Sequence, residues 1–326
     1  MKHMREFKEL FDVNILRYIS TKEQELSIID SEAAILVQII AEFIKNGGKR
    51  IRPALFYYAS TSYGGNKKDA LMQSMVFEFF QTFCLIHDDI IDQSDLRRGK
   101  PTVHKQHDLP TAILSGDMAL MIADELFYSF PSADAVVKTY NTFKQEVLMG
   151  EYLDSKGSHN TEKVMDLKTA RYSFVRPVEL GLRMANCDGK IIENWQTILH
   201  ATGMVFQLKD DLMGVYGNEE TIGKSASSDL AVGKYTQLIK YFTKTASESE
   251  MQIFQTYFGK ETLLSSELDV LKDLLRSKDV PQKISNSILQ QSRLIRSDLQ
   301  KMQDVSLHSV LRDVLDGIED MTIIRI

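Results

Sequence analysis

The chain has 326 residues, of which 26% are charged, 43% hydrophobic and 9% aromatic. A hydrophobic fraction this high can bury a large core, which excludes global disorder. The formal net charge of −6 gives no basic footprint for duplex nucleic acid, so no nucleic-acid partner is expected. Only 6 prolines interrupt the chain. Because proline breaks helix interiors, their scarcity allows long helices almost everywhere and predicts an all-α fold.

The cysteines and the apolar stretches bear on where the protein works. Cys84 and Cys187 show no paired spacing and no neighbouring His cluster, so neither a disulfide framework nor a structural zinc site is expected. The first twenty residues lack the apolar core of a signal peptide. The longest apolar stretch, 33–44, is too short to span a membrane. The sequence therefore predicts a soluble, cytoplasmic protein with no transmembrane segment.

Apolar residues recur at helical spacing along most of the chain. The first helical patterns cover 5–45 and end at a break with two glycines, three cations and Pro53. An almost wholly apolar helix follows to residue 91, as is typical of the centre of a bundle. After a second basic break, the helical patterns run through about 130 and then over 134–153, 162–185 and 190–213. The chain reads as a loop from Gly214 to residue 234 and as amphipathic helices over 236–326, one of them opening at Pro281. One all-helical domain over 1–326, a single large bundle, is predicted.

A first candidate site lies at the end of the most apolar helix. Asp88 and Asp92 are four residues apart and share one helix face, with Asp89 beside them. Like charges so placed repel, so a cation must compensate them. Oxygen ligands of this kind suit Mg²⁺, which binds through carboxylates and substrate phosphates. A solvated acidic helix end is the alternative, and the apolar surroundings favour the metal site.

A second acidic group strengthens this interpretation. Gln207, Asp210 and Asp211 fall at i, i+3 and i+4, again on one face at the end of an apolar helix. Two such faces could oppose each other across a bundle, as in helix-bundle metal sites. The sequence thus predicts a catalytic cavity in the bundle core that holds a cluster of divalent ions. Most of their ligands would come from a polyphosphate.

The basic residues point to an anionic substrate independently. They gather at breaks that flank both acidic groups, and Arg and Lys are the side chains that bind phosphate oxygens. Any one of them alone would be read as a surface charge. Together they predict a diphosphate held by metal on one side and by cations on the other; they are Lys49, Arg52, Arg97, Arg98, Lys168, Lys224 and Lys234.

Several motifs in register resemble those of the trans-isoprenyl diphosphate synthases. They cover residues 47–236 and read GGKRIRP (47–53), LIHDDIIDQSDLRRGKPTVH (85–104), LKTA (167–170), FQLKDDLMGVYG (206–217), GK (223–224) and SDLAVGKYT (228–236). The resemblance implies an all-α bundle of the isoprenoid synthase type, usually a homodimer. It also implies a Mg²⁺-dependent head-to-tail condensation of isopentenyl diphosphate with an allylic diphosphate, with three Mg²⁺ ions per active site when substrate is bound.

The same resemblance implies roles for individual residues. Asp88, Asp92 and Asp210 match the metal ligands, with Asp211 in support. The isopentenyl diphosphate contacts match Lys49, Arg52, Arg98 and Gln81, the last at a position where many members have His. The groups around the allylic diphosphate match Arg97, Lys168, Thr169, Gln207, Lys224 and Lys234. The residues expected to carry the catalytic step are Asp88, Asp92, Lys168, Asp210 and Lys224. One departure is Gly214, which stands where the second motif can have a third Asp.

Residues before the first acidic motif give an indication of the product length. Phe83 lies five residues before Asp88, about 7.5 Å along the helix axis. By the resemblance, an aromatic residue at that position marks short products, and the small neighbour Cys84 is more typical of C20 than of C15 synthases. Phe79 and Phe80 could add to the floor of the cavity or simply pack the core. The sequence predicts geranylgeranyl diphosphate, with farnesyl diphosphate second.

Two other classes of protein remain as alternatives. A class I terpene cyclase also uses an Asp-rich motif and Mg²⁺, but it normally lacks the second Asp pair and the set Lys49, Arg52 and Arg98. A non-catalytic partner subunit of a prenyl synthase commonly loses motif carboxylates, and this chain keeps them.

Overall fold

In the computed structural model we describe residues 2–217, 228–260, 263–302 and 305–320. The chain divides into two compact units. The first contains Met1–Phe143, Ser173–Gln196 and Met302–Val314, and the second contains Lys144–Tyr172, Thr197–Lys301 and Leu315–Ile326. Each unit is described by itself.

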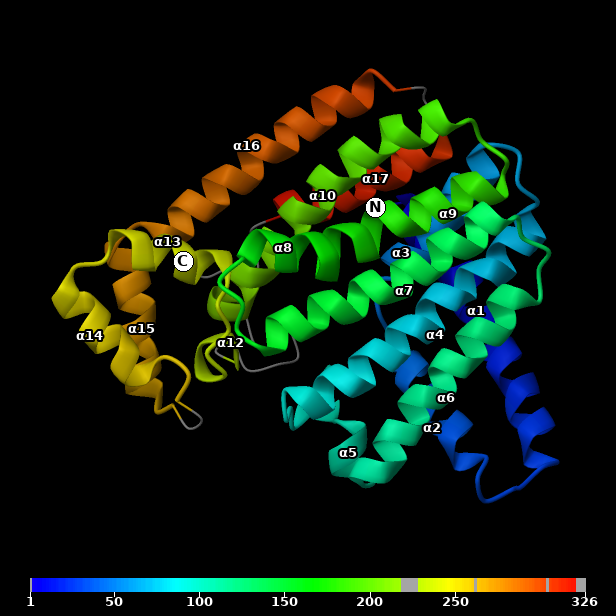
Figure 1. The fold of residues 1–326 in the computed structure, drawn as a ribbon, viewed down its shortest axis with the longest axis horizontal. Helices are drawn as coiled ribbons and strands as arrows, with labels where there is room; N and C mark the ends of the chain where they lie inside the picture. Colours follow the sequence, from blue (N-terminus) through cyan, green and yellow to red (C-terminus); the bar gives the residue numbers. More distant parts are fainter. Residues whose placement is uncertain (1, 218–227, 261–262, 303–304, 321–326) are drawn as a thin grey trace. The chain divides into compact units, whose positions relative to one another are not determined.

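The described chain is built from helices, apart from one pair of two-residue strands (Figure 1), which confirms the all-α prediction. The elements of the first unit are α1 (Lys2–Ser27), α2 (Ile35–Lys45), α3 (Ile51–Ser62), α4 (Lys67–Ile91), β1 (Leu96–Arg97), β2 (Lys100–Pro101), α5 (Val103–Gln106), α6 (Leu109–Tyr128) and α9 (Arg176–Met184). The elements of the second are α8 (Thr161–Met165), α12 (Ser228–Ala231), α13 (Gln237–Thr245), α14 (Glu248–Tyr257), α15 (Ser265–Ser277) and α16 (Val280–Gln300). Four elements have residues in both units: α7 (Asp134–Ser155), the π-helix η1 (Asp166–Val175), α10 (Gly189–Tyr216) and α17 (Ser306–Glu319).

Helix α4 is the centre of the first unit. It begins where the Asn66 side chain accepts hydrogen bonds from the backbone N–H groups of Lys68 and Asp69, a typical N-cap. Phe79 and Phe80 are neighbours in sequence and both are fully buried, so the helix is enclosed on more than one side. It packs against α3 and α6 (Figure 1). The sequence prediction of a central helix ending in the first acidic motif is confirmed.

The second unit packs α13 against α8, α15 and α16. Its aromatic side chains are close-packed, with the rings of Phe242 and Phe254 5.0 Å apart. Helix α16 opens with Pro281 in its first turn, as predicted. The Lys209 ammonium on α10 donates hydrogen bonds to the Gly317 carbonyl, at 2.6 Å, and to the Asp320 carbonyl at the end of α17. A lysine at this position also complements the negative end of the helix dipole.

One local prediction needs correction. Helix α10 does not stop before Gly214 but continues to Tyr216. The second basic break contains a short antiparallel hairpin, in which Leu96 pairs with Pro101. The prediction of one domain over 1–326 stays a prediction. Among the helices of the described residues, none has both the length and the apolar character that crossing a bilayer would require.

Candidate active site

The first acidic motif closes α4 in the first unit. Asp89 is buried, Asp88 is half-buried and Asp92 is exposed. The Nε of Arg97 donates to both carboxylate oxygens of Asp89, at 2.8 and 2.7 Å, and its Nη2 donates to Oδ2 of Asp88 at 2.9 Å. Burial alone would lower the pKa of Arg97, but the two carboxylates outweigh it and raise the pKa. Arg97 therefore supplies the compensating positive charge that the sequence required at this motif.

The hairpin after α4 places two consecutive arginines. Arg98 and Gly99 both have positive φ, +53° and +73°, as a two-residue type I′ turn requires. Arg97 lies in β1 and contacts the acidic motif, whereas the Arg98 guanidinium donates to the Gly47 carbonyl in the first basic break. Neighbouring arginines thus contact different parts of the first unit.

The first basic break is held by a buried ion pair. The Arg50 side chain is 2% exposed; its Nε donates to Asp12 Oδ1 at 2.8 Å and its Nη1 donates to Glu78. Its Nη2 donates to the Ile44 carbonyl at 2.7 Å. Burial raises the pKa of Glu78, and the charges of Arg50, Arg98 and Arg52 oppose that shift. Within the segment 49–52, Arg50 thus has a structural role.

The predicted isopentenyl diphosphate residues have different environments. Lys49 is exposed, and Arg52 and Gln81 are half-buried. Arg98 and Arg52 both act electrostatically on Glu78, so the structure brings these two cations to one neighbourhood. Their role as diphosphate contacts stays a prediction.

In the second unit two lysines meet one carboxylate. The ammonium of Lys168 lies 2.7 Å from Oδ2 of Asp154 and 2.9 Å from Oε2 of Glu151. The ammonium of Lys234 lies 3.1 Å from the same oxygen of Asp154. Burial would raise the pKa of Asp154, but Lys234 and Lys168 lower it below its ordinary value. The structure thus brings together two of the predicted allylic-site lysines.

A chain of hydrogen bonds links η1 to the second acidic motif. The Thr169 hydroxyl donates to the Gln207 side-chain carbonyl, and the Gln207 amide donates to Oδ1 of Asp211 at 2.7 Å. Asp211 is buried, which raises its pKa to about 7, whereas Asp210 is exposed. The segment that carries Thr169 is a π-helix, a rare conformation that recurs at functional sites. Three predicted residues therefore form one connected group.

Some functional candidates were missed by sequence reasoning. Glu151 and Asp154 were not singled out, although their i, i+3 spacing on α7 places them on one face. Arg50 and Glu78 are 28 positions apart, so no local pattern reveals their pairing. Lys224, which was singled out, lies outside the described residues.

The predicted chain-length residues lie on α4 before the motif. Phe83 is 6% exposed, and its ring lies 5.5 Å from that of Phe80 and 4.7 Å from that of His87. Cys84 is half-buried. The Nε2 of His87 is 3.2 Å from the Ile113 carbonyl of α6, so His87 packs between two helices, in agreement with the structural role that its position suggested.

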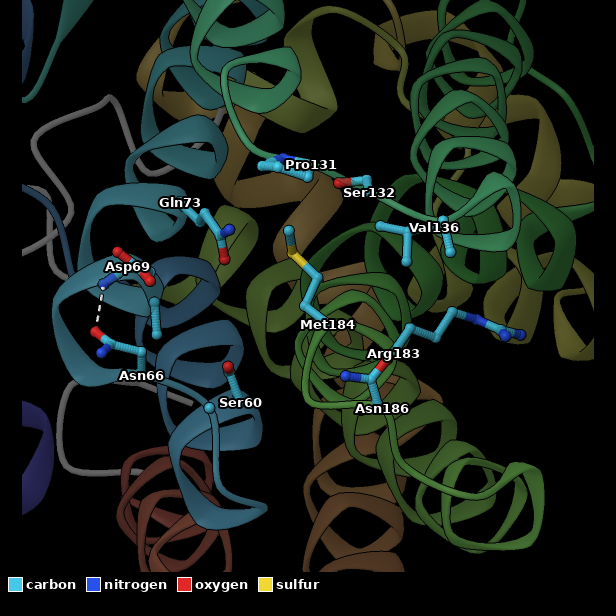
Figure 2. A pocket seen from close by; sticks show the side chains of 13 residues that line it. Ser60, Asn66, Asp69, Gln73, Pro131, Ser132, Val136, Arg183, Met184 and Asn186 are labelled. Atoms are coloured by element: carbon cyan, nitrogen blue, oxygen red, sulfur yellow. Dashed lines mark hydrogen bonds between the residues drawn. The ribbon is translucent and has the colours of Figure 1, made fainter.

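A polar pocket in the first unit lies far from this motif. Its lining includes Asp69 and Gln73 of α4 on one side and, on the other, Arg183 of α9 and Asn186, which follows that helix (Figure 2). Asp69 and Asp88 are 19 positions apart on α4, which is about 28 Å at 1.5 Å per residue. The pocket is therefore not part of the acidic site.

The donor atoms fit a divalent ion that takes most of its ligands from a substrate. Within the described ranges no three His, Cys, Asp or Glu side chains come together as a complete metal site. Asp92 and Asp210 are exposed carboxylates at the C-terminal parts of their helices. Mg²⁺ typically binds through one or two carboxylates, waters and substrate phosphates. Each acidic motif provides a donor set of that kind.

The chain is similar to known proteins over most of its length. The family model described as polyprenyl synthetase matches residues 33–275. The geranylgeranyl diphosphate synthase of Sulfolobus acidocaldarius is 28% identical over 270 residues, 77% of this chain and 79% of the relative. The farnesyl diphosphate synthase of Micrococcus luteus is 34% identical over 236 residues, 67% of this chain and 79% of the relative. A crystal structure of the Corynebacterium glutamicum geranylgeranyl pyrophosphate synthase, complexed with isoprenyl diphosphate and magnesium, has a TM-score of 0.87 at 26% identity and covers 96% of this chain and 98% of that one.

The fold and these similarities define a prenyltransferase. The chain belongs to the polyprenyl synthetase family. The resemblance recognised from the motifs is thereby confirmed, and the terpene cyclase reading is set aside.

Proposed function

We propose that the protein condenses isopentenyl diphosphate with an allylic diphosphate, head to tail, and that its main product is geranylgeranyl diphosphate. The observation that carries the proposal is the convergence of Lys168 and Lys234 on one oxygen of Asp154. Two ammonium groups that meet at one anionic point are suited to bind the oxygens of a diphosphate. The similarity to the S. acidocaldarius enzyme supports the C20 product.

In this proposal the chain's own residues bind, orient and shield the substrates. Lys168, Lys234 and Arg97 bind the allylic diphosphate and stabilise the charge that develops as its C–O bond breaks. Lys49, Arg52 and Arg98 orient isopentenyl diphosphate, whose double bond then forms the new C–C bond. The cation formed by this bond then loses a proton to the released diphosphate. The isopentenyl double bond is itself the nucleophile, so none is needed from the protein.

Asp88, Asp92 and Asp210 would hold Mg²⁺, with Asp211, Gln207 and Thr169 orienting the second motif. When bound, Mg²⁺ supplies Lewis-acid stabilisation of the departing diphosphate. We expect three ions per active site with substrate bound. We also expect Lys224 and Gln81 to contact the allylic and isopentenyl diphosphates, respectively, and the protein to work as a cytoplasmic homodimer.

Buried aromatic side chains set the product length in this proposal. Phe83 is proposed to close the cavity below the first motif, with Cys84 leaving room for a C20 chain. The apolar wall also excludes water, which would otherwise quench the allylic cation.

Product analysis tests the proposal. The purified protein is incubated with Mg²⁺, isopentenyl diphosphate and, in turn, dimethylallyl, geranyl and farnesyl diphosphate, and the products are identified by mass. Elongation to C20 from all three starters is expected, with an Asp92→Asn variant as inactive control. A product that stops at C15 would instead support the farnesyl alternative, which the similarity to the M. luteus enzyme favours. No turnover by the protein alone would support a partner subunit.

A further inference from the structure

One face of α10 carries the second acidic motif and ends in a glycine. Gln207, Asp210, Asp211 and Gly214 fall at i, i+3, i+4 and i+7, so they share this face. The first three carry polar side chains, and Gly214 carries none. The position is nevertheless filled from another segment.

The carboxylate of Asp229 lies over Gly214. A Cβ built on Gly214 would be 2.3 Å from Oδ2 and 2.9 Å from Cγ of Asp229. These distances are shorter than real Cβ contacts, so a side chain at position 214 would displace the Asp229 carboxylate from α10. Asp229 thus brings a carboxylate to the place where a third Asp of the motif would stand.

The backbone around Asp229 is held by contacts that do not involve its carboxylate. The Lys234 N–H donates to the Asp229 carbonyl at 2.9 Å, and the Gly259 N–H donates to the Leu230 carbonyl at 3.0 Å. Leu230 is 1% exposed and anchors α12 in the core of the second unit. The fold therefore presents the Asp229 side chain at α10 from a fixed segment.

Asp229 also belongs to the same electrostatic environment as the motif. Burial is the main cause of the raised pKa of Asp211; among the charges, Lys234 lowers it, and Asp229 and Asp210 raise it further. Asp229 is therefore close enough to Asp211 for their charges to interact. Three carboxylates concentrated at one helix face need a cation to balance them.

We propose that Asp229 supplies the third carboxylate of the second acidic motif, in place of the side chain absent at Gly214, and strengthens the binding of the divalent ion held by Asp210. The inference rests on the proposed function, because Asp210 is a ligand only within it. Asp229 acts as a positioning residue here: it adds negative charge and a hydrogen-bond acceptor for the water that Mg²⁺ retains.

The test moves the carboxylate from one segment to the other. One variant is Asp229→Asn, and a second combines Gly214→Asp with Asp229→Gly, which returns the carboxylate to α10 and removes the clash. Asp269→Asn is the matched control, because it removes the same charge from an exposed position on α15 in the same unit. Mg²⁺ binding is measured by calorimetry in saturating inorganic pyrophosphate, independently of turnover.

Asp229→Asn is expected to weaken Mg²⁺ binding about tenfold, the low end of the effect of removing a group that supports metal ligands. The double variant should restore binding to within about threefold, the usual uncertainty of such effects. Asp269→Asn should bind as the wild type does. In steady-state assays the KM for the allylic diphosphate should rise in Asp229→Asn, whereas the KM for isopentenyl diphosphate should not.

Asp210→Asn separates the inference from the proposed function. If Asp210→Asn weakens Mg²⁺ binding but Asp229→Asn does not, the inference is overturned and the metal site stands. If neither variant changes Mg²⁺ binding, the proposed metal site itself is wrong. Failure of the double variant to recover binding, with an unchanged circular dichroism spectrum, would also overturn the inference.

Discussion

Arg50 offers a quantitative test of how the first basic break is built. Its guanidinium is 2% exposed and neutralises Glu78, whose side chain is 9% exposed. Replacing Arg50 by Met keeps much of the volume but leaves Glu78 as a buried carboxylate without its main partner. Removing one partner of a buried ion pair lowers the free energy of unfolding by about 3–5 kcal/mol. The Ile44 carbonyl also loses its donor, which adds about 1 kcal/mol.

Combining Arg50→Met with Glu78→Met isolates the contribution of the ion pair to the free energy of unfolding. Replacing both charges by apolar side chains removes the stranded carboxylate, so the double variant should recover about 3 kcal/mol relative to Arg50→Met. Trp195 is the only tryptophan of the chain, is fully buried and belongs to the first unit. Its fluorescence during urea unfolding therefore reports the unit that contains Arg50.

Either of two results would show that Arg50 and Glu78 do not form a coupled buried pair. The first is that Arg50→Met lowers the free energy of unfolding by less than about 1 kcal/mol, as expected for an exposed ion pair. The effects of the two substitutions could also be simply additive, which would mean that Arg50 and Glu78 are not coupled. Lys8→Met is the control, since its pair with Asp12 is more exposed.

Three further substitutions test the site. Phe83→Ala should lengthen the products, measured by chromatography of the reaction lipids, because it removes the proposed floor. Arg98→Ala should raise the KM for isopentenyl diphosphate about tenfold with a smaller change in kcat, the loss expected for one charged hydrogen bond. Asp154→Asn should lower the melting temperature at pH 7, and the difference from the wild type should shrink as the pH falls below about 3.9, because the pKa of Asp154 is depressed in the folded state. Its stabilising effect is thus present above its unfolded pKa of about 3.9 and is lost as the pH falls through the lower folded value.

Each of these expectations can be contradicted. An unchanged product distribution would refute the floor assignment of Phe83. For Arg98, an unchanged KM in a folded variant would remove it from the isopentenyl diphosphate site, with Lys105→Ala as an exposed control on α5. A melting difference for Asp154→Asn that persists unchanged at pH 3 would show that hydrogen bonding or packing, not ionisation, is what Asp154 contributes.

The helices and the acidic motifs could be predicted from the sequence because both depend on local spacing. Apolar residues at three- and four-residue intervals give α4 and α10, and the carboxylates at their ends follow from the same period. Glycine was the less reliable signal. Gly214 was taken as the start of a loop, but the close approach of Asp229, fifteen residues later, explains a glycine inside a continuous helix.

The ionic partners could not be predicted, because they depend on tertiary contacts. Lys49, Arg50 and Arg52 look alike in sequence, and only the distant Glu78 and Asp12 assign Arg50 to the interior. The ion pair between Lys168 and Asp154 on α7 could not be predicted from the sequence around Lys168 either. Propensity and periodicity say which side chains share a helix face, but not which other segment that face contacts.

Two of the ion pairs bear on how the proposed ligands would bind. Arg97 is bound to Asp88, and Lys168 is bound to Asp154. A cation that captured Asp88 by itself would take one carboxylate partner from Arg97, which also binds Asp89. An anion that captured Lys168 would likewise leave Asp154 with Lys234. In the proposed function, each ligand alone would therefore meet a partly displaced group of its own sign. Electrostatics would then favour the magnesium salt of a diphosphate over either ion separately.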